Sequence, residues 1–523
     1  MERYFNIAGP CFPDEHYMLP ALDRLPEARG LVRRRQYFVI HAPRQTGKTT
    51  ALKALAREIN EQCDMFAIYC TLETLQNATD VDDAMAKVVK LLRRGAFAVP
   101  ALAELLGEPG AALTISQEPG WTVTAVSETL TAICRKARKP VVVFFDEADC
   151  LAGNVLISFL RQLRDGYVNR DMIPFPTSVA LVGMLDVRDY KAQIRPDGES
   201  LGQISPFNII SKDMLIRNFT EEEVRALYAQ HTAETGQVFE SAATDAVLRF
   251  TCGQPWLVNA IARECVEEIH GFRYGEPVTA ADVETAKETI IRRRDTHVDS
   301  LMERMREPRI RRIVEPLILG GESPVSRDSE DYRFVTDLGL LKDDGHGGLV
   351  PANRMYAEII GRYLSRDTQE SMKASIRETP WATPDGLDMP GLMAAFQSFW
   401  RENSEADRHV HDYREATPHL VLMAFLQRVI NGGGRVEREM ALGSGRLDLC
   451  VEYRGHRYAV EVKTSANFRG KDSYRQCAGY LDDLGLSEGW MPIFDKSKQK
   501  AWEEKIYTRD EVFNGKTIHV IGL

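Results

Sequence analysis

Two groups of residues, far apart in a chain of 523 residues, have types and spacings that could do chemistry. The first is "APRQTGKTT", which follows the apolar run "YFVIH" and precedes a stretch with helical spacing. A loop between a strand and a helix N-terminus holds phosphate oxygens with its backbone amides. Lys48 would reach the β- and γ-phosphates of a nucleotide, and Thr49 would place its hydroxyl on Mg²⁺. We expect nucleotide contacts from Pro43, Arg44, Gln45, Thr46, Gly47, Lys48, Thr49 and Thr50.

A second stretch, "VVVFFDEADC", supports a nucleotide site. Its apolar run leads into Asp146 and Glu147 at the carboxyl end of a buried strand, where Asp146 could hold Mg²⁺ through water and Glu147 could orient the attacking water. One departure from GxxxxGK[ST] is Ala42, which stands where the first glycine belongs. If that position needs a left-handed backbone, alanine costs about 1 kcal/mol there. The two stretches together predict an ATP site.

The other group lies in "GSGRLDLCVEYRGHRYAVEVKTSA", whose two alternating apolar runs predict a β-hairpin with Arg454 and Gly455 as the loop. In that register Asp448 lies opposite Glu461, with Cβ atoms about 5 Å apart. Lys463 points to the same face, as does Arg446 opposite it. A slip of one residue would move the strands relative to each other.

Facing carboxylates are destabilising unless a cation lies between them, and hard oxygen ligands suit Mg²⁺ or Mn²⁺. Such a metal can activate water and neutralise charge that develops on a phosphate. Lys463 would then orient that water or stabilise the transition state. The alternative is a surface hairpin with a solvated salt-bridge cluster. The apolar setting of "YAVEVK" speaks against that alternative.

The surrounding sequence indicates how these residues are positioned. Apolar runs at 37–41, 65–70, 141–145 and 178–185 alternate with helical segments, which is the pattern of a parallel α/β sheet. Helices follow, starting at a capping box of Thr220 and Glu223. We expect five segments: an ATPase core at 1–218, a helical segment at 219–295, a mixed segment at 296–365, a polar linker at 366–389 and a final α/β unit at 390–523.

The composition of the chain indicates its solubility class, its compartment and how it could bind nucleic acid. Hydrophobic residues make up 44% and charged residues 27% of the chain, as in soluble globular proteins. Nine scattered cysteines without metal or disulfide spacing, no visible secretory signal and no membrane-spanning apolar run predict a cytoplasmic protein. The net charge of −10 argues against a general basic coat, so a nucleic-acid partner would need local basic patches. The best candidates are Arg292 to Arg294, together with Arg306, Arg309, Arg311 and Arg312, although such runs are often solvated helix faces.

The front region, about residues 1–360, resembles the AAA-related ATPases, in particular the group that shares features with STAND ATPases. Besides the two nucleotide motifs, "CGQPWLVNAIA" is similar to the GxP element of their helical lid. The segment at 296–365 is similar to their winged helix. The resemblance implies nucleotide-driven conformational change and homo-oligomers. Arg161, Arg164 or Arg170 could then act as an arginine finger, or each could be part of a solvated helix face.

The rear region, about residues 390–500, resembles the PD-(D/E)XK nuclease superfamily, with a restriction-endonuclease-like α/β fold. Asp448, Glu461 and Lys463 match its core, and Gln476 and Tyr480 match residues on the following helix. Many members add a glutamate from the preceding helix, for which the candidates are Glu415 and, less well placed, Glu437. Leu447 precedes the aspartate where the family name has proline, at a position that varies in kind. Catalytic roles would fall to Asp448, Glu461, Lys463, Gln476 and Tyr480, and metal binding to Asp448, Glu461 and Glu415.

The sequence therefore predicts an ATPase that controls a metal-dependent nuclease, with ATP, Mg²⁺ and possible use of Mn²⁺ at the nuclease site. DNA is the expected substrate, a regulatory protein could be a further partner, and no membrane contact is expected. This architecture would fit bacterial defence against foreign DNA. The alternative is a nucleotide-switched signalling or DNA-binding module whose nuclease fold only binds. A DNA motor or loader is a weaker reading, because helicase motifs beyond the nucleotide pair are not seen.

Overall fold

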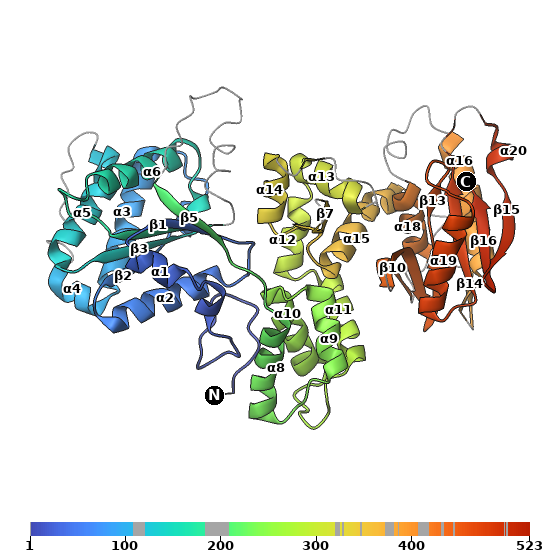
Figure 1. The fold of residues 1–523 in the computed structure, drawn as a ribbon, viewed down its shortest axis with the longest axis horizontal. Helices are drawn as coiled ribbons and strands as arrows, with labels where there is room; N and C mark the ends of the chain where they lie inside the picture. The colour runs from blue at the N-terminus through green and yellow to red at the C-terminus, as the bar shows by residue number, and fades with distance from the viewer. Residues whose placement is uncertain are drawn as a thin grey trace. The chain divides into compact units, whose positions relative to one another are not determined.

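The chain folds as two compact units in a computed structural model (Figure 1). The first unit comprises Met1–His297 and Val325–Asp343, and the second comprises Val298–Pro324 and Asp344–Leu523. The structure describes residues 2–107, 121–183, 209–318, 325–326, 329–345, 348–371, 381–384, 386–405, 418–429, 434–442, 445–495, 497 and 500–523. The segment predicted at 296–365 is thus shared between the two units. No described helix is long and apolar enough to cross a membrane.

The first unit is built on a five-stranded parallel sheet in the order β2-β3-β4-β1-β5. The predicted parallel α/β core is confirmed, and β5 adds an edge strand that the sequence analysis missed. Its sequence, "ISKDML", has no apolar run, because an edge strand is only partly buried. The strands are β1 (Tyr37–His41), β2 (Phe66–Thr71), β3 (Val141–Asp146), β4 (Ser178–Gly183) and β5 (Ile210–Leu215).

Helices cover both faces of this sheet (Figure 1). One face carries α1 (Ala28–Arg33) and α2 (Lys48–Gln62), which pack in one apolar cluster with alternate strand residues such as Phe38 and Ile40. The opposite face carries α6, whose Phe159 meets Phe145 of β3 edge to face at 5.0 Å. The helices on that face are α3 (Val81–Phe97), α5 (Ala125–Ala137) and α6 (Gly153–Val168), with α4 (Pro100–Leu106) beside α3 and α5.

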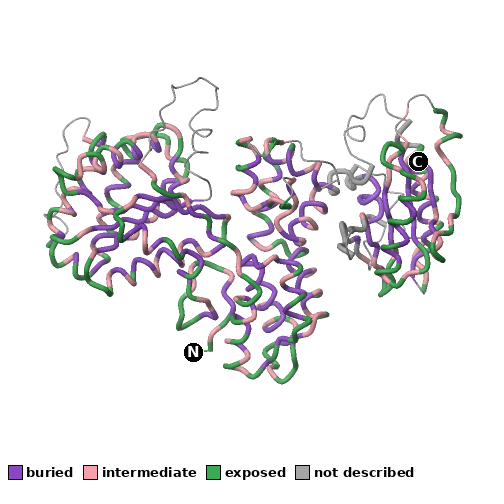
Figure 2. Tube along the Cα trace, in the orientation of Figure 1, coloured by how far each residue is buried: buried purple, intermediate pink, exposed green. Residues whose placement is uncertain are grey.

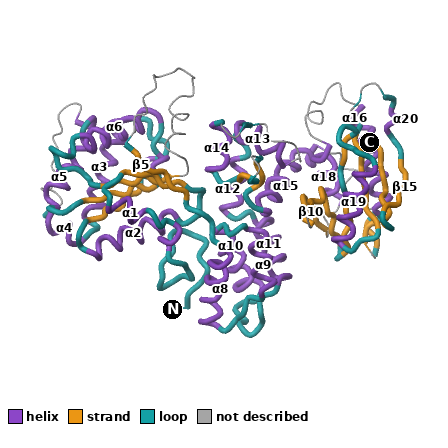
Figure 3. The backbone as a smooth tube through the Cα atoms, viewed as in Figure 1, coloured by secondary structure: helices purple, strands orange, loops and turns teal. Residues whose placement is uncertain are grey.

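A helical region follows the sheet, as Figure 3 shows for α8 to α11. The predicted capping box is present: Thr220 accepts a hydrogen bond from the Glu223 backbone, and the Glu223 side chain accepts one from the Thr220 backbone. The helices are α8 (Glu221–Thr235), α9 (Ser241–Thr251), α10 (Pro255–Arg263), a π-helical turn (Glu264–Ile269) and α11 (Ala280–Arg293). Helix α14 (Glu330–Asp337) and strand β6 (Leu341–Asp343) also belong to the first unit.

The second unit contains a mixed sheet in the order β10-β11-β12-β14-β16-β15, with β13 beside β14. The β12–β14 and β14–β16 pairs are parallel, and the remaining neighbours in that order are antiparallel. The strands are β10 (Gly434–Leu442), β11 (Gly445–Tyr453), β12 (His456–Val460), β13 (Lys463–Thr464), β14 (Glu488–Phe494), β15 (Thr508–Phe513) and β16 (Lys516–Gly522). Ahead of the sheet come α12 (Thr296–Arg304), α13 (Pro308–Ile318), β7 (Leu349–Pro351), α15 (Arg354–Ser371), β8 (Ala382–Thr383) and β9 (Gly386–Leu387).

Helices also cover both faces of this second sheet, and its central strands β14 and β16 are largely buried (Figure 2). Helix α19 (Lys471–Leu484) buries Cys477 and Leu481 against Met491 of β14 and Val520 of β16. Aromatic side chains from α16 (Met389–Glu405) lie against Phe494 of β14 from the opposite face, and α18 (Pro418–Val429) packs against them. A short helix, α20 (Trp502–Lys505), precedes β15.

Candidate functional site

The phosphate-binding loop runs from the end of β1 to the start of α2, where the sequence predicts it. Gln45 and Gly47 have left-handed backbones, with φ of 59° and 91°. Thr46 closes the loop by donating its hydroxyl hydrogen to the carbonyl of Pro43 at 2.9 Å. Ala42 has no left-handed φ, so the strain considered for alanine at this position does not arise. Left-handed residues of this kind are typical of loops whose backbone amides bind an anion.

Lys48 lies inside this loop with 5% of its surface exposed. Its Nζ donates to the carbonyls of Ala42 at 2.8 Å and Pro43 at 3.0 Å. Burial lowers the pKa of Lys48, and the negative charges of Glu147, Asp149 and Asp146 oppose that effect. Phosphate oxygens would satisfy the buried ammonium better than carbonyls do.

The predicted magnesium residues meet at the carboxyl end of β3. Asp146 is buried and accepts hydrogen bonds at its Oδ2 from the Thr49 hydroxyl and the Tyr69 hydroxyl, both at 2.7 Å. These hard oxygens beside Lys48 are the donor set that Mg²⁺ prefers next to a nucleotide phosphate. Sequence reasoning missed Tyr69, which the parallel pairing of β2 with β3 brings to Asp146.

Glu147 follows Asp146 with a left-handed backbone, at φ 54°. Burial raises its pKa, and Lys48 opposes that increase. A carboxylate that is partly desolvated and lies next to the phosphate site can orient or deprotonate a water.

The helical region contacts the phosphate-binding loop through Gln45. Gln254, at the start of α10, donates its Nε2 hydrogen to the Gln45 carbonyl at 3.5 Å. His297 Nδ1 shares a hydrogen bond with Gln45 Oε1, and the ring of Trp256 stacks on His297 at 4.7 Å. Gly253, which precedes Gln254, passes so close to Phe219 that an added Cβ would lie 2.0 Å from the Phe219 carbonyl oxygen.

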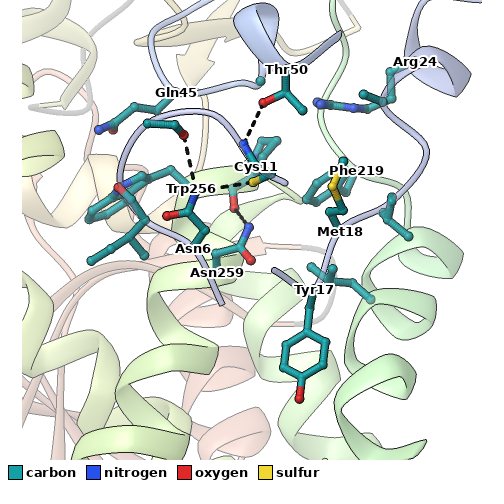
Figure 4. A pocket seen from close by; sticks show the side chains of 17 residues that line it. Asn6, Cys11, Tyr17, Met18, Arg24, Gln45, Thr50, Phe219, Trp256 and Asn259 are labelled. Atoms are coloured by element: carbon teal, nitrogen blue, oxygen red, sulfur yellow. Dashed lines mark hydrogen bonds between the residues drawn. The ribbon is translucent and has the colours of Figure 1, made fainter. Parts of the chain in front are cut away.

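A cavity of about 100 Å³ lies beside the loop (Figure 4). An N-terminal segment forms one wall, held by a hydrogen bond from the Cys11 backbone to the Thr50 hydroxyl at 3.2 Å and one from Trp256 Nε1 to the Ile7 carbonyl at 2.8 Å. The labelled polar and aromatic side chains that line it include Asn6, Arg24, Gln45, Phe219, Trp256 and Asn259. Its position at Gly47 and Thr50 suits the nucleoside part of a ligand whose phosphates lie in the loop.

The three candidate arginine fingers, Arg161, Arg164 and Arg170, differ in their surroundings. The Arg170 guanidinium lies 4.0 Å from the Tyr167 ring centroid and donates to the Arg35 carbonyl at 3.3 Å, so it is held within its own unit. Arg161 on α6 is exposed, and Arg164 is half-buried.

The candidate DNA-binding cluster in α11 is largely ion-paired. Arg292 pairs with Glu288 at 2.6 Å, and Arg293 pairs with Asp295 at 2.7 Å and Glu264 at 2.9 Å. In α13, Arg311 pairs with Glu315 at 2.8 Å. These pairs favour the interpretation as solvated or salt-bridged helix faces for those residues.

In the second unit, the hairpin register agrees with the prediction. Tyr453 pairs with His456, and Arg454 and Gly455 form a two-residue turn with φ of 49° and 83°. This left-handed pair matches the twist of the strands it joins. The ladder ends at Leu449 and Val460, one step short of the acidic residues.

The acidic residues and the lysine converge just beyond that ladder. Asp448 Oδ2 accepts a hydrogen bond from the Val462 backbone at 2.8 Å, and Glu461 Oε2 accepts one from the Asp448 backbone at 3.4 Å. Lys463 Nζ lies 2.7 Å from Glu461 Oε1. The prediction that Lys463 lies opposite Arg446 is wrong, because the β11–β12 pairing stops at Leu449 and Val460, and Lys463 pairs instead with Ile493 of β14.

Helix α19 supplies the remaining predicted residues. Lys463 Nζ donates to Gln476 Oε1 at 3.1 Å, and Gln476 Nε2 donates to the Tyr480 hydroxyl at 2.8 Å. Five predicted residues are thus joined by hydrogen bonds: Asp448, Glu461, Lys463, Gln476 and Tyr480. Glu415 lies outside the described residues, and the side chain of Glu437 is likewise not described.

Glu461 is the most perturbed group of this cluster. Burial and the nearby charge of Asp448 raise its pKa to about 7, and Lys463 opposes the increase. A shared cation would relieve the repulsion between the two carboxylates. Two carboxylates can hold Mg²⁺ when water or substrate phosphate completes the shell. Among the described residues there is no group of three or more His, Cys, Asp or Glu side chains placed to hold a metal.

Comparison with known proteins supports the class of the first unit. Residues 32–190 match the family model described as AAA domain. Together with the loop, Lys48, Thr49 and the Asp146–Glu147 pair, this match defines an AAA-type P-loop ATPase domain. No curated protein is similar enough to the chain to count as a match.

Solved structures that resemble the chain include three from archaea and bacteria. The Walker-type ATPase PABY2304 of Pyrococcus abyssi is 13% identical, with a TM-score of 0.48 over 68% of this chain and 99% of that one. The RuvB Holliday junction branch migration motor of Thermotoga maritima is 12% identical, with a TM-score of 0.32 over 65% of this chain and 92% of that one. Cdc6p of Pyrobaculum aerophilum is 13% identical, with a TM-score of 0.34 over 67% of this chain and 94% of that one. Similarities of this size do not define an activity.

Proposed function

We propose that the protein is an ATP-controlled, metal-dependent nuclease that cuts nucleic acid, with DNA as the expected substrate. One observation carries the proposal: Asp448, Glu461 and Lys463 converge at the buried end of the hairpin, in a chain whose other unit is an AAA-type ATPase. A solvated surface cluster would not bury Glu461 to 1% exposure. Such burial of a charged group is costly and is a frequent mark of a functional site.

Each residue of the cluster has a defined part in this proposal. Asp448 and Glu461 would bind Mg²⁺ or Mn²⁺, with Glu415 as a further proposed oxygen ligand. When bound, the metal supplies a Lewis acid that activates water and neutralises charge on the phosphate. Lys463 would orient the attacking water or stabilise the negative charge of the transition state. Gln476 would hold the Lys463 ammonium in place by accepting its hydrogen bond, and the Tyr480 hydroxyl would orient Gln476.

The ATPase would regulate this cutting through its nucleotide state. ATP and Mg²⁺ would bind at the loop residues from Pro43 to Thr50 and at Asp146, with Glu147 as the catalytic acid–base residue. Contact between Gln254 and Gln45 gives the helical lid a route to respond to the ligand. We further propose a homo-oligomer, a regulatory protein partner and a role in defence against foreign DNA, which the joining of an ATPase to a nuclease in one chain motivates.

The deciding experiment is cleavage of plasmid and linear DNA with Mg²⁺ or Mn²⁺, with and without ATP. Wild type is compared with Lys463→Ala and Lys48→Ala. Loss of cutting in Lys463→Ala, with ATP binding retained, and altered cutting in Lys48→Ala would establish one coupled enzyme. Undiminished metal-dependent cutting by Lys463→Ala would refute the nuclease assignment. If no condition gives cutting of DNA or RNA that depends on Lys463, the nucleotide-switched binding module becomes the better description.

A further inference from the structure

Arg24 lies against the phosphate-binding loop, although no sequence motif includes it. It ends a short 3-10 helix (Ala21–Arg24), and its side chain is 8% exposed. Its NH1 donates to the Thr46 carbonyl at 2.7 Å and to the Arg217 carbonyl at 3.3 Å. Its NH2 lies beside Gly47, where an added Cβ would be only 2.7 Å away. Glycine at position 47 therefore leaves room for this guanidinium as well as for the turn.

The Arg24 cation has no carboxylate ion pair among the described residues. Glu223, whose charge acts on it, is bound instead by Arg217 at 2.6 Å. Both carbonyl contacts use NH1, so Nε and NH2 have no hydrogen-bond acceptor in the part of the chain that the structure describes. The Phe219 ring, 4.8 Å from the guanidinium carbon, is the neighbour that faces the cation. A buried cation without an anionic partner is costly, which calls for an anion that arrives from outside.

The free N–H groups face the place where a nucleotide would bind. Arg24 lines the cavity together with Gly47 and Thr50, and Figure 4 shows its guanidinium directed toward Thr50. Lys48 Nζ lies elsewhere in the loop, at the carbonyls of Ala42 and Pro43, where the terminal phosphates are expected. An acceptor at the Arg24 side would thus belong to the phosphate nearest the nucleoside.

We propose that Arg24 binds the α-phosphate of the bound nucleotide and so supplies a second cation to the site, opposite Lys48. The inference rests on the proposed nucleotide-binding function of the loop. Because ADP and ATP share the α-phosphate, Arg24 serves both alike and does not distinguish the two nucleotide states. It sets the affinity of the site, and Lys48 with the magnesium residues responds to the γ-phosphate.

Calorimetric binding of ADP and ATP to the full-length protein tests this role. Arg24→Gln should weaken both nucleotides by the same factor, about 10- to 100-fold, which is the typical loss of a hydrogen bond to a charged group. Arg24→Lys keeps the cation and should recover most of the affinity. The Kd of Arg24→Gln should also rise less steeply with salt than that of wild type, because one charge–charge contact is missing. Arg29→Gln is the control, since Arg29 pairs with Glu58 on the surface.

The outcomes separate phosphate binding from a purely structural role. Wild-type ADP affinity in Arg24→Gln would overturn the proposal. So would equal weakening in the Gln and Lys variants with an unchanged salt dependence, which would mean that Arg24 only shapes the loop. If Arg24→Gln does not fold, Arg24→Lys carries the test, and a folded Arg24→Lys that binds no ADP would contradict it. Failure of the proposed function looks different, because wild type itself would then bind neither nucleotide.

Discussion

Lys463 and Glu461 form an ion pair of 2.7 Å between Nζ and Oε1 at the point where the hairpin ends. The Glu461 side chain is 1% exposed and the Lys463 side chain is 12% exposed, so neither charge is well solvated. Removing one member of such a pair leaves the other buried and uncompensated. The protonation state of Glu461 therefore depends on Lys463. A metal that binds Glu461 would compete with the proton and would also change this ion pair.

We expect metal binding in the second unit to depend on pH around neutrality. Burial and Asp448 raise the pKa of Glu461 to about 7, and a carboxyl group must lose its proton to bind Mg²⁺ or Mn²⁺. Affinity for Mn²⁺, measured by calorimetry in Lys48→Ala to silence the ATP site, should rise as pH increases through about 7. The Glu461→Gln variant should bind Mn²⁺ weakly at every pH. An affinity that is independent of pH across this range would contradict the interpretation.

The same pKa has a consequence for stability. The folded pKa of Glu461 lies above the unfolded value of 4.5, so the folded state holds the proton more tightly. Stability from this group is complete below about 4.5 and is lost as pH rises through about 7. Thermal melts without metal should show that loss, and saturating Mg²⁺ should reduce it. The loss should be absent in Glu461→Gln, which cannot titrate.

Lys463→Ala should shift the pH dependence of Mn²⁺ affinity, so that half-maximal affinity is reached at a higher pH than in wild type. This effect adds to the loss of cleavage. The reason is that Lys463 lowers the pKa of Glu461, and its removal leaves burial and Asp448 unopposed. Calorimetric titration across pH in this variant measures the midpoint directly. Lys505→Ala, a lysine remote from the hairpin in sequence, provides the control. An unchanged midpoint would show that the ion pair has little effect on the Glu461 proton.

Gln476 and Tyr480 should differ in importance although they form one hydrogen-bonded chain. Gln476→Ala removes an acceptor of the Lys463 ammonium and is expected to slow cleavage about tenfold, the equivalent of one hydrogen bond to a charged group. Tyr480→Phe removes only the hydroxyl that accepts from Gln476 Nε2, so its effect should be smaller. Single-turnover cleavage rates at saturating metal compare the two. A larger loss in Tyr480→Phe would indicate that the hydroxyl itself touches the substrate.

Glu147→Gln should separate ATP binding from hydrolysis. The glutamine keeps the size of the side chain but cannot accept a proton, so hydrolysis should slow by about 100-fold or more. ATP affinity should change little, because Lys48, Thr49 and Asp146 remain in place. Phosphate release and ATP binding are measured side by side, with the exposed Glu61 of α2 changed to Gln as the control. Wild-type hydrolysis in Glu147→Gln would assign the acid–base role to another residue.

The sequence predicts these sites well where a short pattern determines the local structure. The phosphate-binding loop and the β3 acids follow from a short motif next to continuous apolar runs, and the hairpin register follows from period-two alternation and its turn residues. The strand β5 escapes detection because its residues are largely polar. Tyr69 and Arg24 escape because their contacts depend on strand pairing and on the packing of the N-terminal segment. The misplaced Arg446 has a local cause: the Glu461 backbone donates to the Trp490 carbonyl at 2.9 Å, so the chain turns to β14 and the alternation with β11 stops.

His41, the last residue of β1, links the start of the phosphate-binding loop to α14 through an ion pair with Asp337. Its Nδ1 lies 2.7 Å from Asp213 of β5, and its Nε2 lies 3.5 Å from Asp337 of α14. Burial alone would lower the pKa of His41, but hydrogen bonds with the two aspartates raise it to about 10. The folded pKa thus exceeds the unfolded value of 6.5, so this stabilisation is complete below about 6.5 and is lost as pH rises through about 10. Gly339, just after α14, lies against Pro43 of the loop, so α14 is held at a second point.

Asp337→Asn should therefore lower the melting temperature at neutral pH, and the difference from wild type should shrink as pH approaches about 10. The physical reason is that the imidazolium loses one of its two carboxylate partners, and at high pH wild type no longer has the imidazolium to stabilise. Because His41 directly precedes the loop, ADP affinity should fall in the same variant. Asp331→Asn, near the start of α14, is the matched control. If the melting temperatures of Asp337→Asn and wild type differ by the same amount at every pH, then a neutral histidine occupies this position and the coupling does not depend on charge.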